Sequence, residues 1–300
     1  MTHGHEHGHG DRRLLTAALT LLVVFMAVEV VAAVLASSLA LLADAGHMLV
    51  DVLALLMALA AGALALRPAD GRWTFGLARA EVLSAAVNGI TLLVVSAVLV
   101  VEAVQRLLHP RDVDGVPLIV VAGVGLLVNV VAAALLSRAD RSSLNIAGAF
   151  AHVLTDAYAF AATIVAGIVV VATGFRRADP IASLVVVVLM LHAAWQLLRD
   201  SGHVLLEAAP DNVDLTTLRA HLLETPNVLD VHDLHVWTSG SRLPSVSAHV
   251  VVSEACFSGG LAPQLLDELQ GCLAGHFDVE HSTFQFEPAG HTEHEAGAHH

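Results

Sequence analysis

Six long apolar segments, separated by short polar ones, fill the first two thirds of the chain. They cover roughly residues 14–36, 39–66, 80–107, 116–137, 145–173 and 179–199. Each segment is long enough to cross the hydrocarbon core of a bilayer as an α-helix of about 20 residues. Since six crossings return the chain to its starting side, the pattern predicts an all-α, six-helix transmembrane domain over residues 13–201.

The pattern of apolar and polar positions changes from about residue 203 onward. Helical spacing and strand-like alternation now follow each other in short segments. The predicted helices are residues 214–223 and 262–277, and the predicted strands are residues 228–237, 244–252 and 282–286. This order predicts a small α+β sandwich over residues 202–288, in which the helices cover one face of a sheet.

The composition supports this division into two parts. Hydrophobic residues make up 56% of the chain and charged residues only 14%, whereas soluble domains have about 25% charged residues. Of the 28 acidic residues, 15 lie in residues 200–300, beside only two arginines, Arg219 and Arg242. The chain therefore begins with a membrane domain that has a net charge close to zero and the lipid bilayer as its partner. An acidic, water-soluble domain follows it.

Arginines near the ends of the apolar segments divide unevenly between the two sides of the membrane. On the side of the N-terminus are Arg12, Arg13, Arg67, Arg72, Arg79, Arg138, Arg141 and Arg199. On the other side are Arg106, Arg111, Arg176 and Arg177. Because cytoplasmic loops are enriched in basic residues, this distribution predicts a multi-pass protein of the cytoplasmic membrane with both termini in the cytoplasm.

Both ends of the chain are polar and rich in histidine. Residues 1–12 and 289–300 cannot bury a core, so their composition predicts disordered tails. The interleaved histidines of residues 1–10 favour weak metal capture, with an expression tag as the alternative. The cysteines Cys256 and Cys272 lack a CxxC spacing, so they indicate neither a disulfide framework nor a thiolate metal cluster.

Two histidine–aspartate pairs stand out inside the apolar segments. His47 precedes Asp51, and His152 precedes Asp156, by four residues, which places each pair on one face of a helix. An isolated charge at membrane depth costs about 3 kcal/mol or more. Imidazole nitrogens and carboxylate oxygens are typical zinc ligands. The pairs therefore predict a divalent metal site, with two independent intrahelical hydrogen bonds as the alternative. Asp44, three residues before His47 on the same face, is expected to be a supporting carboxylate or part of the outer access route.

The two pairs have similar depths in the predicted membrane domain. His47 lies about 12 Å from the outer end of the second helix, at about 1.5 Å per residue. His152 and Asp156 lie a similar distance from the inner end of the fifth helix. Since these helices run in opposite directions, the four side chains are expected to meet near the midplane of the bilayer.

Metal binding at such a site is coupled to protons. Histidine must be neutral and aspartate ionised before either binds the ion, and the ordinary pKa of histidine lies near neutral pH. The sequence contains no Walker-type phosphate-binding loop. A proton-driven antiporter is therefore predicted, with H⁺ as the counter-ion.

Several stretches together resemble the cation diffusion facilitator family. They are residues 38–51 (SLALLADAGHMLVD), Phe75-Gly76, residues 79–83 (RAEVL), Leu144-Asn145 leading to His152 and Asp156, residues 179–183 (DPIAS) and residues 231–237 (VHDLHVW). The resemblance implies a homodimeric exporter of zinc or a related divalent cation, with His47, Asp51, His152 and Asp156 as its transport site.

The resemblance also implies a metallochaperone-like, ferredoxin-like cytosolic domain that pairs across the dimer and binds additional metal. The matching ligand positions are His232, His249 and Glu287, with His281 as a fourth candidate. Adjacent strands carry these residues, so a sheet edge can bring them together. Lone histidines such as His203, His221 and His276 need no explanation beyond solvation.

Two other functions compete with transport as explanations of the histidine–aspartate pairs. An intramembrane zinc enzyme is disfavoured because the sequence has no HExxH motif and no spare general base beside the ligands, so no enzymatic activity is expected. A membrane-anchored metal sensor would not need paired ligands at the midplane. No nucleic-acid partner is expected. Imidazole and carboxylate ligands do not rank zinc against cadmium, cobalt, nickel, iron or manganese.

Overall fold

The computed structural model describes residues 3–35, 39–109, 115–140, 143–240, 244–277, 279 and 281–291. Within these ranges, the side chains of residues 3–11, 32, 33, 35, 39–47, 115, 117 and 118 lie outside the description. The chain divides into two compact units, residues 1–202 and residues 203–300.

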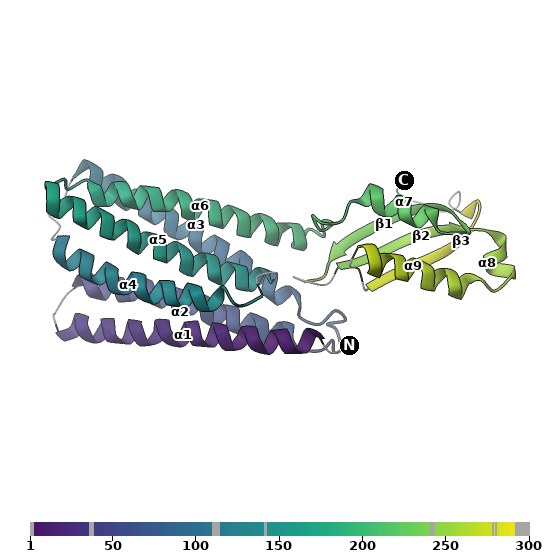
Figure 1. The fold of residues 1–300 in the computed structure, drawn as a ribbon, viewed down its shortest axis with the longest axis horizontal. Coiled ribbons are helices and arrows are strands. Elements are labelled where there is room, and N and C mark those ends of the chain that lie inside the picture. Colours follow the sequence, from purple (N-terminus) through teal and green to yellow (C-terminus); the bar gives the residue numbers. More distant parts are fainter. Residues whose placement is uncertain are drawn as a thin grey trace. The chain divides into compact units, whose positions relative to one another are not determined.

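Six long helices form the first unit (Figure 1). They are α1 (His3–Leu35), α2 (Leu39–Ala65), α3 (Arg79–Leu108), α4 (Gly115–Leu136), α5 (Leu144–Thr173) and α6 (Ala178–Leu205). Each contains an apolar stretch of at least 18 residues, long enough to cross a membrane. The predicted six-helix transmembrane domain is therefore confirmed.

Helix α1 begins earlier than the apolar pattern predicts. Its described part starts at His3, so residues 3–12 are helical where the composition predicts a disordered tail. The physical reason is that extending an existing helix costs far less than starting a new one. The other predicted tail, residues 289–300, lies outside the described residues from residue 292 onward.

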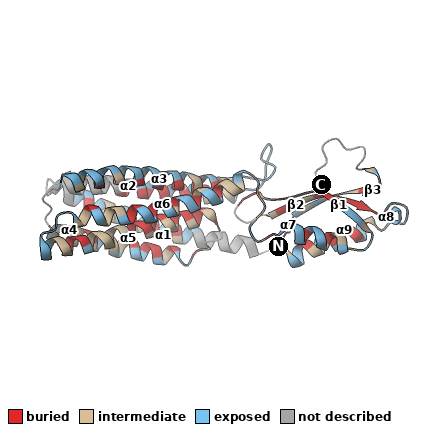
Figure 2. Cartoon of the chain, turned by 90° about the horizontal axis from the view of Figure 1, so that it is seen from above, coloured by how far each residue is buried: buried red, intermediate tan, exposed pale blue. Residues whose placement is uncertain are grey.

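Packing and exposure in this unit match a bundle surrounded by lipid. Leu22 on α1, Leu55 on α2, Leu136 on α4 and Val153 on α5 belong to one buried apolar cluster. The outward faces of the helices are exposed along their length (Figure 2), and they carry many large apolar side chains, such as that of Val28. Exposed apolar surface of this extent would be unfavourable in water and is suited to hydrocarbon.

The second unit contains a three-stranded sheet with helices. Its elements are α7 (Leu215–Glu224), β1 (Val228–Thr238), β2 (Pro244–Val252), α8 (Glu254–Ser258), α9 (Ala262–His276) and β3 (His281–Pro288). The strand order is β1-β2-β3, in which β1 and β2 are antiparallel and β2 and β3 are parallel. The predicted α+β fold is confirmed; the five-residue helix α8 is too short to leave a periodic signal.

The sheet has one face covered by helices and one that carries polar groups. Val246 and Val250 of β2 share a buried core with Leu222 of α7 and Leu269 of α9. Since side chains alternate along a strand, His249 points to the opposite face. The sheet therefore separates the helices from the histidine of β2.

Candidate metal centres

Three of the predicted ligands meet between α2 and α5. Nε2 of His152 lies 2.8 Å from Oδ1 of Asp51 and 3.8 Å from Oδ2 of Asp156. The residues Asp51, His152 and Asp156 are only 5%, 3% and 8% exposed. We call these three residues the membrane cluster. Because its short contact joins two helices, it differs from a pair of independent intrahelical hydrogen bonds.

The spacing of the membrane cluster suits one small divalent cation. One donor atom from each of the three residues lies within 4.8 Å of the other two. A tetrahedral zinc ion with bonds of about 2.0–2.1 Å holds a nitrogen and an oxygen donor about 3.3 Å apart. The two distances from Nε2 of His152 fall on either side of this value, so small side-chain rotations are sufficient for all three to bind one ion.

A hydrogen bond near the start of α5 sets the register of α2 against α5. Nδ2 of Asn145 donates to the carbonyl oxygen of Ala58 at 2.7 Å. Asp51 lies seven residues before Ala58, and His152 lies seven residues after Asn145. Because the helices run in opposite directions, equal offsets of two turns bring Asp51 and His152 to the same level. The sequence pattern alone assigns no role to Asn145. Its spacing of two turns from His152, on the same face of the helix, could have marked it as a neighbour of the ligands.

The other two predicted members of the transmembrane site cannot be placed in the same way. His47 and Asp44 belong to α2 (Leu39–Ala65), but their side chains lie outside the described residues. His47 as a ligand and Asp44 as a supporting carboxylate therefore stay predictions.

Further polar side chains lie near the start of α5. The hydroxyl of Ser143 donates to Oε2 of Glu81 at 3.0 Å, which joins α3 to the segment before α5. Asn88 of α3 is fully buried, and neither its amide nitrogen nor its amide oxygen has a hydrogen-bond partner among the described residues. Its Nδ2 lies 3.7 Å from the position of a Cβ atom on Gly148, four residues before His152. The amide is thus available to a polar ligand on this side of the cluster.

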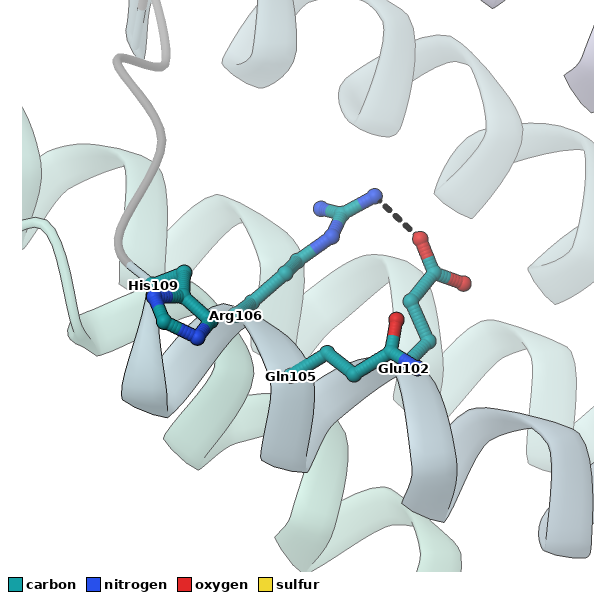
Figure 3. Close-up of a pocket in the computed structure, with 4 residues that line it drawn as sticks. All are labelled: Glu102, Gln105, Arg106 and His109. Atoms are coloured by element: carbon teal, nitrogen blue, oxygen red, sulfur yellow. Dashed lines mark hydrogen bonds and ion pairs between the residues drawn. The ribbon is translucent and has the colours of Figure 1, made fainter.

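A separate polar junction lies at the other end of α3. Arg106 forms an ion pair with Glu102, four residues before it on α3, and its Nη1 also lies 3.2 Å from Oδ2 of Asp179 at the start of α6. Figure 3 shows Arg106 directed toward Glu102, beside Gln105 and His109, which line the same pocket of about 330 Å³. Since Arg106 contacts carboxylates on two helices, we assign this junction a structural role in joining α3 to α6.

The second unit, residues 203–300, contains a second group of ligands, which we call the His232 cluster: His232, His249 and Glu287. Oε2 of Glu287 lies 3.1 Å from Nε2 of His232, and its Oε1 lies 2.7 Å from Nδ1 of His249. The two imidazole rings are 5.1 Å apart between centroids. The carboxylate therefore bridges two imidazoles that could share a metal ion with it.

The strand register explains why these three residues meet. His232 of β1 pairs directly with His249 of β2, and Glu287 of β3 pairs with Val251, two residues further along β2. Side chains two residues apart on a strand share a face. A bulge between His232 and His235, with Asp233 at φ +46°, also bends β1 beside the cluster and re-aims the side chains on either side of it.

His281, the fourth predicted ligand, lies elsewhere in this chain. It begins β3 and pairs with Ser245, six residues before Glu287. At about 3.3 Å per residue, this separation is about 20 Å along the strand. Within one copy of the chain, His281 is therefore not brought to the His232 cluster.

Comparison with known families covers both units. The transmembrane unit matches the family described as "Cation efflux transmembrane domain" over residues 15–206. The cytosolic unit matches "Cation efflux protein, cytoplasmic domain" over residues 210–289. Together the two matches include every residue of the membrane cluster and of the His232 cluster.

Several characterised proteins are similar over nearly the full length. A protein named "Metal cation efflux system protein CzcD" from Cupriavidus metallidurans is 40% identical over 287 residues, which cover 96% of this chain and 90% of that protein. "Zinc transporter ZitB" from Escherichia coli is 40% identical over 300 residues, with coverages of 96% and 93%. The "Cadmium, cobalt and zinc/H(+)-K(+) antiporter" of Bacillus velezensis is 35% identical over 294 residues, with coverages of 97% and 93%.

Among solved structures, the chain is similar to the metal-bound C-terminal domain of the CzcD transporter. That domain is 40% identical in sequence and matches over 25% of this chain and 99% of its own length, with a TM-score of 0.23.

Proposed function

The chain belongs to the cation efflux family, whose members are metal transporters, and we propose that it exports zinc in exchange for protons. The proposed transport site is the membrane cluster together with His47, which lies four residues before Asp51 in the sequence. In this mechanism the site opens to each side of the membrane in turn. The alternative of an intramembrane zinc enzyme is wrong, because the family and the named relatives are transporters.

One contact carries the proposal of proton exchange: the 2.8 Å hydrogen bond between His152 and Asp51. Neither a carboxylate oxygen nor the lone pair of an imidazole nitrogen can donate, so one proton must lie between the two atoms. A metal ion needs these same two atoms with their lone pairs free. Proton and metal therefore compete for one position. If His152 enters the cycle as an imidazolium beside an ionised Asp51, loading the site with zinc releases one proton, whereas a neutral imidazole would only move its hydrogen to Nδ1.

The donor set favours zinc or a chemically similar ion. One imidazole and two carboxylates in the membrane cluster, joined by the imidazole of His47, would complete a four-coordinate site of the kind that Zn²⁺ adopts. Relatives named for zinc, or for cadmium, cobalt and zinc, support this choice. Nitrogen and oxygen donors alone still leave cobalt and cadmium as competing substrates.

We further propose that the polar groups at the start of α5 form the inner access route. Glu81 offers a carboxylate beside Ser143. The amide of Asn88 lies between this end of the helices and the metal ligands, near Gly148. A cation that loses its water shell along this route would meet an oxygen ligand at each step. These ligands would lower the free-energy cost of dehydration. In this orientation both termini lie in the cytoplasm.

The second unit is proposed to bind zinc at the His232 cluster and to pair with the same unit of a second chain. Two imidazoles and a bridging carboxylate are a suitable ligand set for Zn²⁺, and an open position on the ion would be left for a further ligand. The match of residues 210–289 to the cytoplasmic domain of this family supports the pairing, and the geometry of the three side chains supports the metal site. Metal bound here would stabilise the folded domain without being transported.

Purified protein in proteoliposomes with a zinc dye and a pH dye tests the transport proposal. The parent protein should move zinc and protons in opposite directions without a nucleotide. Asp51→Ala and Asp156→Ala should each reduce both fluxes roughly 100-fold, because even residues that only support a metal ligand commonly contribute 10–100-fold.

His192→Gln is the matched control. His192 is an exposed histidine of α6, bonded to Gln196 at 3.0 Å and outside the membrane cluster, so its removal should leave both fluxes unchanged. Undiminished transport by both aspartate variants would rule out this site. Zinc flux without proton flux would rule out exchange, and zinc binding with no flux in the parent would indicate a sensor.

A further inference from the structure

The connection between α2 and α3 exposes aromatic side chains that belong to neither of the clusters described above. It comprises residues 66–78, and we call it the α2–α3 loop. Trp73 is 63% exposed and Phe75 is 58% exposed, although tryptophan and phenylalanine side chains are mostly buried in folded proteins. Two large aromatic side chains exposed on one short loop indicate contact with another molecule.

Backbone hydrogen bonds give the α2–α3 loop a defined shape. The N–H of Trp73 donates to the carbonyl oxygen of Asp70 at 3.0 Å, and the N–H of Gly76 donates to the carbonyl oxygen of Trp73 at 2.9 Å. Gly76 has φ +67°, and a Cβ atom there would lie 3.1 Å from the carbonyl oxygen of Arg67. The loop thus folds back on itself, and its exposed aromatic side chains lie on ordered turns.

The α2–α3 loop lies at the membrane surface. The apolar span of α2 ends at Ala65 and that of α3 begins at Arg79, at the end of the bundle where α1 begins (Figure 1). The headgroup region adds only about 5–8 Å on each side of the hydrocarbon core, so a loop that folds back on itself stays within reach of it. Leu66, the first residue of the loop, is exposed to the same extent as Leu56 on the outward face of α2. The apolar surface of the loop therefore continues the surface that faces the hydrocarbon.

Basic side chains on the same loop suit the phosphate groups of anionic lipids. Residues 66–79 contain Arg67, Arg72 and Arg79, with Asp70 as the only acidic residue. Arg67 and Arg72 are exposed, so their guanidinium groups can be reached by a ligand. A guanidinium group can bind a phosphate through two parallel hydrogen bonds, and tryptophan prefers the headgroup level of a bilayer. The two kinds of side chain therefore fit one partner, a lipid surface.

We propose that the α2–α3 loop binds anionic lipids. Trp73 and Phe75 insert among the headgroups, and Arg67 and Arg72 bind the lipid phosphates. The aromatic side chains anchor the loop in any bilayer, whereas the arginines select lipids with a net negative charge. The proposal uses no residue of either metal cluster, so it can fail while the transport proposal holds, and the reverse.

The fluorescence of Trp73 in the reconstituted full-length protein tests this proposal. The chain has three tryptophans, and replacing Trp195 and Trp237 by phenylalanine leaves Trp73 alone. The vesicles contain phosphatidylcholine with a minor fraction of anionic phosphatidylglycerol. Bromine atoms, which quench tryptophan, are placed near the headgroup of one lipid or of an equal amount of the other. Both should quench Trp73, with a preference for phosphatidylglycerol of about fivefold for each arginine that binds, the usual factor for a basic residue at an anionic surface.

Arginine variants separate specific binding from a general effect of charge. Arg72→Gln should lower the preference for phosphatidylglycerol about fivefold and leave quenching by phosphatidylcholine unchanged. Arg138→Gln is the matched control, because it removes an exposed arginine that follows α4 at the same end of the bundle. It should change neither signal. If the protein with a single tryptophan does not fold, the quenching that is lost between the parent and Trp73→Phe measures the same contact.

Three results would overturn the proposal. Quenching of Trp73 by dissolved acrylamide and by neither lipid would place the loop in water. Quenching by none of these reagents would mean that protein covers the loop, as a second part of this chain or a second copy could. Equal quenching by the two lipids would overturn the binding of anionic lipids, because the arginines would then have no preference.

Discussion

The membrane cluster and the His232 cluster use similar ligands on very different supports. In the membrane cluster, Asp51 and His152 come from two helices whose backbones share no ladder of hydrogen bonds, and Asn145 provides a side-chain tie between them. In the His232 cluster, backbone pairing between three strands fixes the ligands, with a bulge in β1 directly after His232. Helices joined by side chains can shift past one another, whereas a strand ladder holds its register.

The difference indicates which cluster releases its ion. A transported ion must leave on the far side, so its ligands have to separate during the cycle. Ligands on a sheet cannot separate without breaking several backbone hydrogen bonds. We therefore expect the His232 cluster to retain its ion and stabilise the domain, and the membrane cluster to exchange its ion. Three experiments test this contrast between a retained and an exchanged ion.

The largest expected effect comes from removing the bridging carboxylate of the His232 cluster. At a zinc concentration 100-fold above Kd, binding stabilises the folded state by about 2.7 kcal/mol. Glu287→Gln should abolish that gain, because the amide keeps the size of the side chain and loses its charge. Amide hydrogen exchange in the full-length protein should then no longer slow in β1 and β2 when zinc is added, while zinc transport continues.

The matched variant is Asp51→Asn, which should show the opposite result. It should lose transport and keep the slowing of exchange in β1 and β2 by zinc, since the two clusters share no residue. If Glu287→Gln stopped transport as completely as Asp51→Asn, the His232 cluster would have to be part of the transport cycle, and the contrast between a retained and an exchanged ion would fail.

Much of this arrangement could be predicted from the sequence because its signals are local. Apolar segments of membrane length and the alternation of residues 244–252 each report on one element. The His152–Asp156 spacing also lies within one helix. Composition did not predict the helical start of α1 at His3. It describes the polar segment in isolation and takes no account of the helix to which the segment is joined.

Local sequence patterns could not predict the contacts between different helices. Asn145 is a single polar residue, and its partner is a backbone carbonyl of Ala58, which no side-chain pattern marks.

The second experiment tests whether one hydrogen bond sets the register of the membrane cluster. Asn145→Ala removes the tie to Ala58 and should lower the free energy of unfolding by about 0.6 kcal/mol, the average for interhelical hydrogen bonds in membranes. Zinc transport should fall as well, because Asp51 and His152 lose their common level. Thermal unfolding in detergent and transport in proteoliposomes measure the two effects.

Thr163→Val is the control for Asn145→Ala. It removes a hydrogen bond from Thr163 to the carbonyl oxygen of Ala159, 2.9 Å away within α5, and leaves the tie between helices intact. Transport should then stay at the parent level. Equal losses of transport in the two variants would mean that any weakening of the bundle slows the cycle, and that Asn145 has no special role in the register.

The smallest expected effect concerns α7, which borders the sheet without supplying a ligand to the His232 cluster. Asp214 caps this helix by accepting a hydrogen bond from the backbone N–H of Thr217 at 2.7 Å. This bond lowers the pKa of the Asp214 carboxyl in the folded protein. Asp214→Ala should speed amide exchange in the first turn of α7, while zinc affinity at the His232 cluster stays the same because the strand ladder holds the ligands.

The pH dependence of this helix cap provides a further test of the contrast between the two clusters. Since the pKa is lower in the folded state, the stabilisation is fully present above the ordinary pKa of aspartate and is lost as pH falls through the folded-state value. Exchange in α7 should therefore differ between the parent and Asp214→Ala near neutral pH and converge in acid. Asp211→Ala, an exposed aspartate outside the cap, should match the parent throughout. If zinc affinity fell in Asp214→Ala at neutral pH, the His232 cluster would depend on its neighbouring helix, and the sheet alone would not explain why its ion is retained.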